Sequence, residues 1–429
     1  MSKQKRIAIT GIGPIGSVGI GKDDFWKGVV NKETNVELEK SYAGNEVWDE
    51  YYVHKIKNFD IKNFGIDEDD LEYIEDWKES SIDMDLQYLL ASVKLALDDA
   101  KIDHKKEAKD SVSLIVTNEN LGMEDFCKTF LCESFAKMKK SKNITEKEFC
   151  DDIYYKIVRS GYEIQTFMPL FHVARTFNIH KYSLFVNNAC ASGLYAIEAA
   201  SDLIKLNKVP MVVVSASDHS NIYKHLWFKM INMYESDGKI KPYSKDSRGL
   251  VMGEGASTLI LEDYEHAKKR GAKIYAEYLG GGFRLEGWKI TIPQVGGTSY
   301  EEAIQEALKE SNIKRDAIDL ICGHAPGTTA ADAYEAQAIS NVFGDCKAPV
   351  TALKPYVGHS LGASTLVETA ILLLGLDKNI TVPTLNTKKV DDRFKIDLVK
   401  DERNLKLKTV MKLCCAFAGY NAACVFRKA

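Results

Sequence analysis

The chain has 429 residues, of which 45% are hydrophobic and 28% charged, with a net charge of −4; this composition is ordinary for a globular protein long enough to hold two cores. The lack of a basic excess argues against nucleic-acid binding, and we expect neither a signal peptide nor a membrane-spanning segment. Nine scattered cysteines without CxxC pairs predict a reduced, cytoplasmic protein rather than a disulfide framework or a structural zinc site.

The first predicted strand, residues 6–10, is followed by Gly11, Gly13 and Gly16. These glycines formally match the GxGxxG dinucleotide-binding pattern. That pattern requires a helix to open inside it, whereas residues 17–21 are expected to continue as a loop. We therefore interpret the glycines as part of a tight turn.

Two polar segments interrupt the predicted core elements. Residues 34–80 are irregular and rich in charged residues, and we expect surface loops and short helices there. Residues 120–165 form the second such segment, and within it we expect residues 122–160 to be charged and helical. Between these two insertions the apolar spacing predicts an amphipathic helix over 83–100 and a buried strand over 112–116.

The stretch LFVNNACASGLYAIEAA, residues 184–200, carries the first candidate functional residue. A predicted strand over 182–186 leads to Cys190, and small residues then open a helix. Unpaired N–H groups and the helix dipole stabilise a thiolate at such a position, which predicts a lowered pKa and a nucleophilic Cys190. The alternative is a small buried residue that packs a strand–helix corner.

The second half of the chain repeats this pattern. A predicted strand over 318–322 precedes His324, and a short strand over 350–353 leads to Lys354 and His359. A helix is then expected from Ser360 to Leu374, with Gly375 ending it. Because NNACASGLYAIEAA and YVGHSLGASTLVETA are similar, we predict two related α/β halves, residues 1–262 and 263–429. The chain closes with a predicted hairpin of strands over 409–415 and 422–427.

Cys190, His324 and His359 each follow a predicted strand, where α/β active sites form. A cysteine with one histidine suggests acyl transfer through a thioester. Two neutral imidazoles can in addition donate through Nε2 to one carbonyl oxygen, which stabilises an enolate formed by decarboxylation. The sequence contains no HxxxH or HExxH pair, so we expect no metal.

Together these stretches resemble the β-ketoacyl–acyl carrier protein synthases, the ketosynthases of fatty-acid and polyketide assembly. The resemblance extends from about residue 5 to residue 427. The residues that carry it are Asn188 to Gly193 around the cysteine, His324 with Asp332 and Glu335, Lys354 with His359 and Glu368, Val251 to Ser257, and the closing Phe417 and Asn421.

The resemblance implies a thiolase-like, duplicated five-layer αβαβα fold that is normally dimeric. Cys190 would take an acyl chain from an acyl carrier protein supplied in trans. His324 and His359 would hold the carbonyl of a malonyl thioester as CO2 leaves. The N–H groups of Cys190 and Phe417 would form the oxyanion hole, and Phe417 would gate malonyl entry.

Other residues are given supporting roles by the same resemblance. Lys354 would orient the side of the pocket near the second histidine, paired with Glu335 or Glu368, because a buried lysine requires such a partner. Thr328 would contact the phosphopantetheine arm, which enters as part of the substrate, and no cofactor is expected to be bound. The remaining supporting positions are Asp332 and Asn421.

The chain departs from the family pattern in two loops. Pro326 replaces the first of two threonines that follow the first histidine. Ala416 and Ala418 replace glycines around Phe417, and because alanine restricts φ we expect a stiffer gate. These departures favour a specialised, polyketide-type or polyene-type synthase.

Two other functions remain as alternatives. The chain could be the catalytic or scaffold subunit of a ketosynthase/chain-length-factor heterodimer, although scaffold subunits lack the cysteine and Cys190 is intact. It could also be a cysteine-dependent acyltransferase on the same fold, although that chemistry needs only one histidine.

Overall fold

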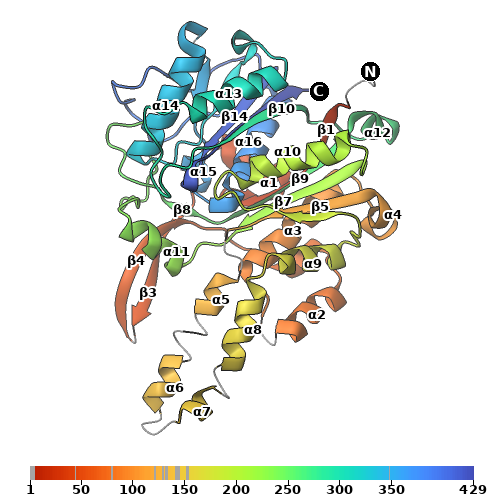
Figure 1. Cartoon of the computed structure of the whole chain (residues 1–429), viewed down its shortest axis with the longest axis vertical. Coiled ribbons are helices and arrows are strands. Elements are labelled where there is room, and N and C mark those ends of the chain that lie inside the picture. The colour runs from red at the N-terminus through yellow and green to blue at the C-terminus, as the bar shows by residue number, and fades with distance from the viewer. Residues whose placement is uncertain are drawn as a thin grey trace.

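The computed structural model describes residues 5–43, 45–78, 81–119, 122–127, 130, 134–140, 145–150, 154–346 and 348–429. Its centre is a large mixed sheet with helices on both outer faces and between its two halves (Figure 1). In this part of the chain no helix is both long and apolar enough to cross a lipid bilayer.

The strands fall into two sets that follow the chain. The N-terminal set is β1 (Ile7–Gly16), β5 (Val112–Thr117), β6 (Ser183–Phe185), β7 (Met211–Asp218) and β9 (Gly255–Asp263), with the short β2 (Gly19–Ile20) beside β1. The C-terminal set is β10 (Ala276–Leu285), β11 (Leu320–Cys322), β12 (Pro349–Thr351), β13 (Asp397–Leu398), β14 (Thr409–Cys415) and β15 (Tyr420–Lys428).

Both sets have the same topology. The order is β1-β9-β7-β5-β6 in the first set and β10-β15-β14-β11-β12 in the second, with β13 added at the end. In each set the first two pairings are antiparallel and the next two are parallel. Antiparallel pairing of β1 with β10 joins the sets. The predicted duplication is therefore confirmed, as is the closing hairpin of β14 and β15; the residue at which one half gives way to the other stays a prediction.

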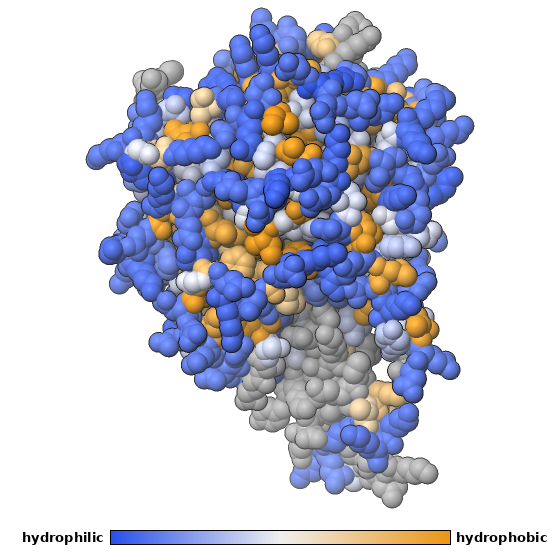
Figure 2. Space-filling view, turned by 180° about the vertical axis from the view of Figure 1, so that it is seen from behind, coloured by the Kyte–Doolittle hydropathy of each residue, from blue (hydrophilic) through white to orange (hydrophobic). Residues whose placement is uncertain are grey.

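Helices complete the five layers. The central layer holds α10 (Ser192–Lys205) and α16 (Ser364–Lys378), which pack on each other and on strands of both sets. On the outer faces, α3 (Met84–Asp99) covers β1, β9 and β7, while α13 (Ser299–Glu310) covers β10 and β15 and packs on α14 (Thr329–Phe343). On the face shown in Figure 2 the rim is mostly hydrophilic and apolar side chains gather near the middle.

The remaining helices lie at the periphery or connect strands. They are α1 (Lys22–Val30), α2 (Glu68–Lys78), α4 (His104–Ser111), α9 (Phe167–Thr176), α11 (Ile222–Met230), α12 (Tyr264–Lys269) and α15 (Lys354–Val357). Short 3-10 turns lie at Ile61–Phe64, Arg315–Ala317, Gly344–Cys346, Leu361–Ala363 and Phe417–Gly419.

Gly11 and Gly13 allow close packing of a helix, so the predicted tight turn is wrong for these two glycines. Gly16 does flank a tight turn, because it pairs with Gly19 across the two-residue turn 17–18 between β1 and β2. Gly11, Gly13 and Gly16 all lie inside the strand. A Cβ at Gly13 would meet the carbonyl oxygen of Ser92 at 2.2 Å, and one at Gly11 would meet that of Ala96 at 2.5 Å. The bare backbone therefore lets α3 lie directly against β1.

The prediction for residues 34–80 is also corrected. Residues 36–54 form a hairpin of β3 (Val36–Ala43) and β4 (Glu46–His54), and β4 pairs with β8 (Met252–Gly253). Much of the hairpin is solvent-exposed, with Tyr42 and Trp48 more than half exposed. Exposure on both faces removes the apolar alternation by which a strand is recognised in a sequence.

The segment 120–165 contains α5 (Met123–Cys127), α6 (Ser134–Lys140), α7 (Glu146–Phe149) and α8 (Tyr155–Glu163), and these extend away from the sheet in Figure 1. This agrees with the predicted helices, although part of the segment lies outside the described residues. In the second half, α16 continues through Gly375 to Lys378, and Asn379, at φ 56°, ends it. The expected glycine cap is therefore wrong. A Cβ at Gly375 would lie 2.7 Å from the Ile380 carbonyl oxygen, so this glycine accommodates the next turn of the chain.

Candidate active site

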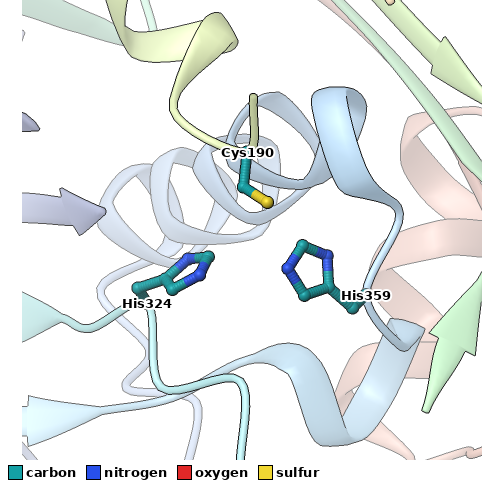
Figure 3. A group of neighbouring side chains, drawn as sticks. All are labelled: Cys190, His324 and His359. Carbon is teal, nitrogen blue, oxygen red and sulfur yellow. The ribbon is translucent and has the colours of Figure 1, made fainter. Parts of the chain in front are cut away.

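Cys190, His324 and His359 converge at the centre of the molecule (Figure 3). The Cys190 sulfur and one nitrogen of each imidazole all lie within 4.8 Å of one another. The centroids of the two imidazole rings are 5.4 Å apart, and the ring planes are nearly perpendicular. The three residues are only 6%, 2% and 2% exposed. The structure therefore brings together the three residues that the sequence singled out.

The duplicated topology explains why these residues meet. Cys190 lies between β6 and α10, and His359 lies between β12 and α16, which are equivalent places in the two halves. Because α10 and α16 pack on each other in the central layer, the turns before them face one another. His324 joins from the end of β11, the strand beside β12.

The hydrogen bonds of the two imidazoles fix where their protons lie. The Leu361 N–H donates to Nδ1 of His359 at 3.0 Å. Nζ of Lys354 lies 3.1 Å from Nδ1 of His324 and donates to that nitrogen. A neutral imidazole whose Nδ1 accepts carries its proton on Nε2. Because Nδ1 of each ring accepts a hydrogen bond, each ring offers its Nε2–H as a donor.

Burial keeps the two histidines uncharged. Loss of solvent lowers the pKa of His324 and of His359 well below the ordinary value, and the positive charge of Lys354 lowers both further. A pair of neutral N–H donors in a dry site suits a carbonyl oxygen on which negative charge develops.

The same protons disfavour a metal at this site. Cysteine with two histidines is a ligand set that suits zinc. However, metal-bound histidines normally donate their second ring N–H to an acceptor, and here both Nδ1 atoms are themselves acceptors. The nitrogens that would bind the ion consequently carry hydrogen instead of a free lone pair.

Lys354 belongs to a buried charged network beside His324. It bonds Glu368 Oε1 at 2.5 Å and the His324 carbonyl oxygen at 2.8 Å. Lys412 bonds the other carboxylate oxygen of Glu368 at 2.6 Å. All three side chains are fully buried. Glu368 is thus the partner of Lys354. The lysine was expected to lie near the second histidine, His359, but it contacts the first histidine, His324.

Glu335, which was considered as a partner of Lys354, instead binds the backbone that follows β11. Its carboxylate accepts from the backbone N–H groups of His324 (2.7 Å) and Ala325 (2.9 Å) and from the hydroxyls of Tyr243 and Tyr300. It therefore holds the backbone of the His324 loop.

Asp332 holds the next part of that loop. It accepts from the Gly327 N–H at 3.1 Å and the Tyr243 N–H at 2.7 Å, and burial raises its pKa to about 8. Asn421 lies at the start of β15, where its side-chain amide donates to the Tyr334 hydroxyl at 3.3 Å.

The protonation of Cys190 differs from the prediction. Burial raises the pKa of its thiol well above the ordinary value, and the Glu119 carboxylate raises it further. The helix starts only at Ser192, and its terminal N–H groups are outweighed by loss of solvent around the sulfur. In the resting protein Cys190 consequently carries a thiol, which would have to lose its proton to act as a nucleophile.

A largely apolar cavity leads to this site. Its wall includes the three converging side chains together with Thr328, Pro326, Phe417 and the loop 289–293. Phe417 packs on Phe228 with ring centres 5.8 Å apart. The N–H of Ala418 donates to the Ile290 carbonyl oxygen at 2.6 Å, so the loop around Phe417 is tied to the loop at the cavity wall.

Several residues of the site were not predicted from the sequence. Lys412 gave a usable signal, because it is the single charged residue in the apolar strand TVMKLCC and a buried lysine needs a partner. Tyr243, Tyr300 and Glu119 lie outside the recognised motifs and gave none, and Cys414, three residues before Phe417, is a common apolar residue in a buried strand. Sγ of Cys414 lies 3.3 Å from Nδ1 of His324.

Comparisons with known proteins agree with this geometry. The model of the β-ketoacyl synthase N-terminal domain matches residues 4–267, and that of the C-terminal domain matches residues 275–388. A 3-oxoacyl-[acyl-carrier-protein] synthase 2 of Vibrio harveyi is 25% identical over 441 residues, covering 100% of this chain and 99% of its own. The corresponding protein of Coxiella burnetii is 31% identical over 255 residues, which are 57% of this chain and 62% of the relative.

Solved structures show the same fold. The ishigamide ketosynthase/chain length factor superposes with a TM-score of 0.83 at 23% identity over 100% of both chains. A type II polyketide ketosynthase in complex with its acyl-carrier protein gives 0.81 at 23% identity, again over 100% of both chains. Together with the two domain models, which cover most of the sequence, these likenesses show that the chain belongs to the β-ketoacyl synthase family.

Proposed function

We propose that this protein is a β-ketoacyl–acyl carrier protein synthase, which joins an acyl chain to a malonyl unit with loss of CO2. The observation that carries the proposal is the convergence of one cysteine thiol and two imidazoles that keep hydrogen on Nε2. A simple acyl transfer needs one histidine, whereas paired neutral donors stabilise an enolate oxygen.

In the first step Cys190 is acylated. Its sulfur attacks the thioester carbonyl of an acyl carrier protein, the bond to the carrier sulfur breaks, and the cysteine proton leaves with the carrier as its thiol. The developing oxyanion would be held by the backbone N–H groups of Cys190 and Phe417.

In the second step a malonyl thioester occupies the cavity. Its carbonyl oxygen would accept from Nε2 of His324 and of His359. As the carbon–carbon bond to the carboxylate breaks, CO2 leaves and the two electrons of that bond remain on the thioester, which becomes an enolate. The enolate carbon then attacks the acyl carbonyl, the bond to the Cys190 sulfur breaks, and the thiolate takes a proton from water.

The cavity supports delivery of both substrates by a phosphopantetheine arm. The arm would enter along the wall that holds Thr328, and Phe417 would gate malonyl access. It arrives as part of the substrate, so no bound cofactor is needed for these steps. The carrier protein would come in trans, as in the polyketide ketosynthase complex to which this fold is similar.

We propose that the working form is a dimer. Among the described strands, β6 pairs with β5 alone and forms one end of the sheet, which leaves backbone groups for a second chain. One of the similar solved structures is a ketosynthase/chain length factor, so a heterodimer in which this chain supplies the catalytic cysteine is the second candidate. Light scattering on the purified chain distinguishes a homodimer from a monomer that awaits its partner.

The proposed reaction is tested by incubating the chain with an acyl-loaded and a malonyl-loaded carrier protein. We expect CO2 and a β-ketoacyl carrier with the wild type, and no β-ketoacyl product with Cys190→Ala. Release of free acid from the acyl carrier, without CO2 or condensation product, would contradict the proposal and indicate a hydrolytic acyltransferase.

A further inference from the structure

Glu119 lies against the turn that carries His359. It follows β5, whose last residue, Thr117, donates to the Gly362 carbonyl oxygen at 3.1 Å. A Cβ at Gly362 would lie 3.1 Å from the Glu119 nitrogen, so the two backbones touch. Since Gly362 is three residues beyond His359 and the Glu119 charge acts on the Cys190 thiol, this carboxylate belongs to the surroundings of the reacting sulfur.

The Glu119 carboxylate is incompletely satisfied. Its Oε2 atom is buried and has no hydrogen-bond partner within the described residues. Burial raises the pKa of the Glu119 carboxyl, and the cation that opposes this rise, Lys224, donates to Asp218 at 2.8 Å and to the His219 carbonyl oxygen at 2.7 Å. An unpaired buried carboxylate oxygen is unfavourable. The described hydrogen bonds of Lys224 go to Asp218 and His219 and not to this oxygen.

The surrounding charges favour a hydrogen-bond donor at this place. Glu119, Asp218 and Asp85 all act on the single ammonium of Lys224. Three carboxylates around one cation leave an excess of acceptors. A hydroxyl or an amino group would satisfy the free Oε2 atom, whereas a hydrocarbon chain would leave it unpaired.

The position of Glu119 indicates which substrate group it would meet. The cavity that leads to Cys190 is walled by the loop 289–293, Thr328 and Phe417, and the described lining does not include Glu119. The carboxylate is therefore not part of the described wall of the entrance cavity. An acyl group attached to the sulfur must extend away from the entrance to leave room for the second thioester.

We propose that Glu119 is a specificity-determining residue, which accepts a hydrogen bond from a hydroxyl or amino group carried near the thioester end of the acyl chain on Cys190. This inference rests on the proposed acylation of Cys190. A site built to bond such a donor rejects an analogue that lacks it far more strongly than an apolar pocket rejects a missing methylene.

The inference is tested with three pantetheine thioesters of one chain length: butyryl, 3-hydroxybutyryl and 3-aminobutyryl. Their rates of acylation are followed by intact-protein mass spectrometry. The wild type is expected to load a donor-bearing chain roughly 10⁴-fold faster than butyryl. Glu119→Leu should remove that preference, and Glu72→Gln, at an exposed glutamate of α2, should retain it.

Glu119→Gln separates the two donors. A glutamine carbonyl still accepts from a hydroxyl, so a preference for the hydroxyacyl chain survives. A preference for the aminoacyl chain, which depends on the charge, is lost. Equal loading of all three thioesters by the wild type, or an unchanged preference in Glu119→Leu, would overturn the inference alone. Failure of every thioester to load the wild type would overturn the proposed function as well.

A second measurement does not depend on substrate. The charged and titratable groups that act on the Cys190 thiol include Glu119, Cys414 and Lys354. Replacing the carboxylate in Glu119→Gln should lower the thiol pKa, and iodoacetamide should then modify Cys190 faster at the same pH, as measured by peptide mapping. An unchanged rate would show that Glu119 does not face the sulfur.

Discussion

Each imidazole of the site has its proton placed by a neighbour that contacts the opposite ring nitrogen. The Leu361 N–H does this for His359 and Lys354 does it for His324. Both neighbours, Lys354 and Leu361, lie close to His359 in the sequence. Their contacts with the Nδ1 atoms nevertheless depend on how the backbone turns and on burial of the lysine. The sequence could therefore predict which histidines meet Cys190, because each follows a strand, but it could not predict their tautomers.

His359→Ala removes one of the two donors. We expect the rate of malonyl decarboxylation to fall about 10²- to 10³-fold, as when one oxyanion donor is lost elsewhere. CO2 release from a malonyl carrier protein measures this, with Glu72→Gln as the control variant. A loss of less than about threefold would show that one imidazole suffices.

The pH dependence follows from the lowered pKa of both histidines. A histidine that titrates near its ordinary 6.5 would become charged, and fail to stay a neutral donor, as the pH falls through that value. Here both remain neutral there, so decarboxylation by the wild type should hold its rate through pH 6.5 and decline only at lower pH. A decline centred near 6.5 would contradict the role of burial.

Glu368→Gln tests the buried network. Two fully buried ammonium groups, Lys354 and Lys412, would lose their shared carboxylate, which costs about 3–5 kcal/mol when one partner of a buried pair is removed. Chemical denaturation measures the free energy of unfolding. Glu402→Gln, at an exposed ion pair with Lys32, should leave it nearly unchanged.

This network also has a pH signature. The lysines lower the pKa of Glu368 in the folded state, although burial opposes them. A depressed carboxyl pKa contributes stability above its unfolded value and loses that contribution as the pH falls through the folded value. The difference in stability between the wild type and Glu368→Gln should therefore shrink in acid. A difference that grows in acid would contradict the pairing.

Among the secondary-structure elements, those with a buried apolar face were predictable and those shaped by close backbone contact were not. The apolar face of α3 and the run in β5 lie where the sequence placed them. Gly11, Gly13 and Gly375 were misinterpreted, because a close approach between two backbones leaves no pattern in one sequence. The β3–β4 hairpin was missed because its tip is exposed on both sides.

The gate loop is an element whose strain can be measured. Ala418 lies at φ 59°, a region that disfavours residues with a Cβ. Ala418→Gly should therefore raise the free energy of unfolding by about 0.5–1 kcal/mol. Ala416→Gly, in the same loop at φ −112°, should lower it by a similar amount. The two variants are compared by denaturation, and shifts of the same sign would contradict the strain.

On the scale of the whole molecule, duplication of one topology creates the site. Each half supplies one turn between its third strand and the following central helix, and those turns carry Cys190 and His359. The similarity of the two stretches predicted this correspondence. The long-range pairings, such as β1 with β10, join residues far apart in the chain, and no local pattern indicated them.

The most direct test of this account is the acylation of Cys190 by acyl carrier proteins of graded chain length, followed by intact-protein mass spectrometry. We predict that the wild type gains the mass of one acyl group and that Cys190→Ala gains none. A wild type that is not acylated by any chain would contradict the account and indicate a protein that needs another subunit or serves as a scaffold.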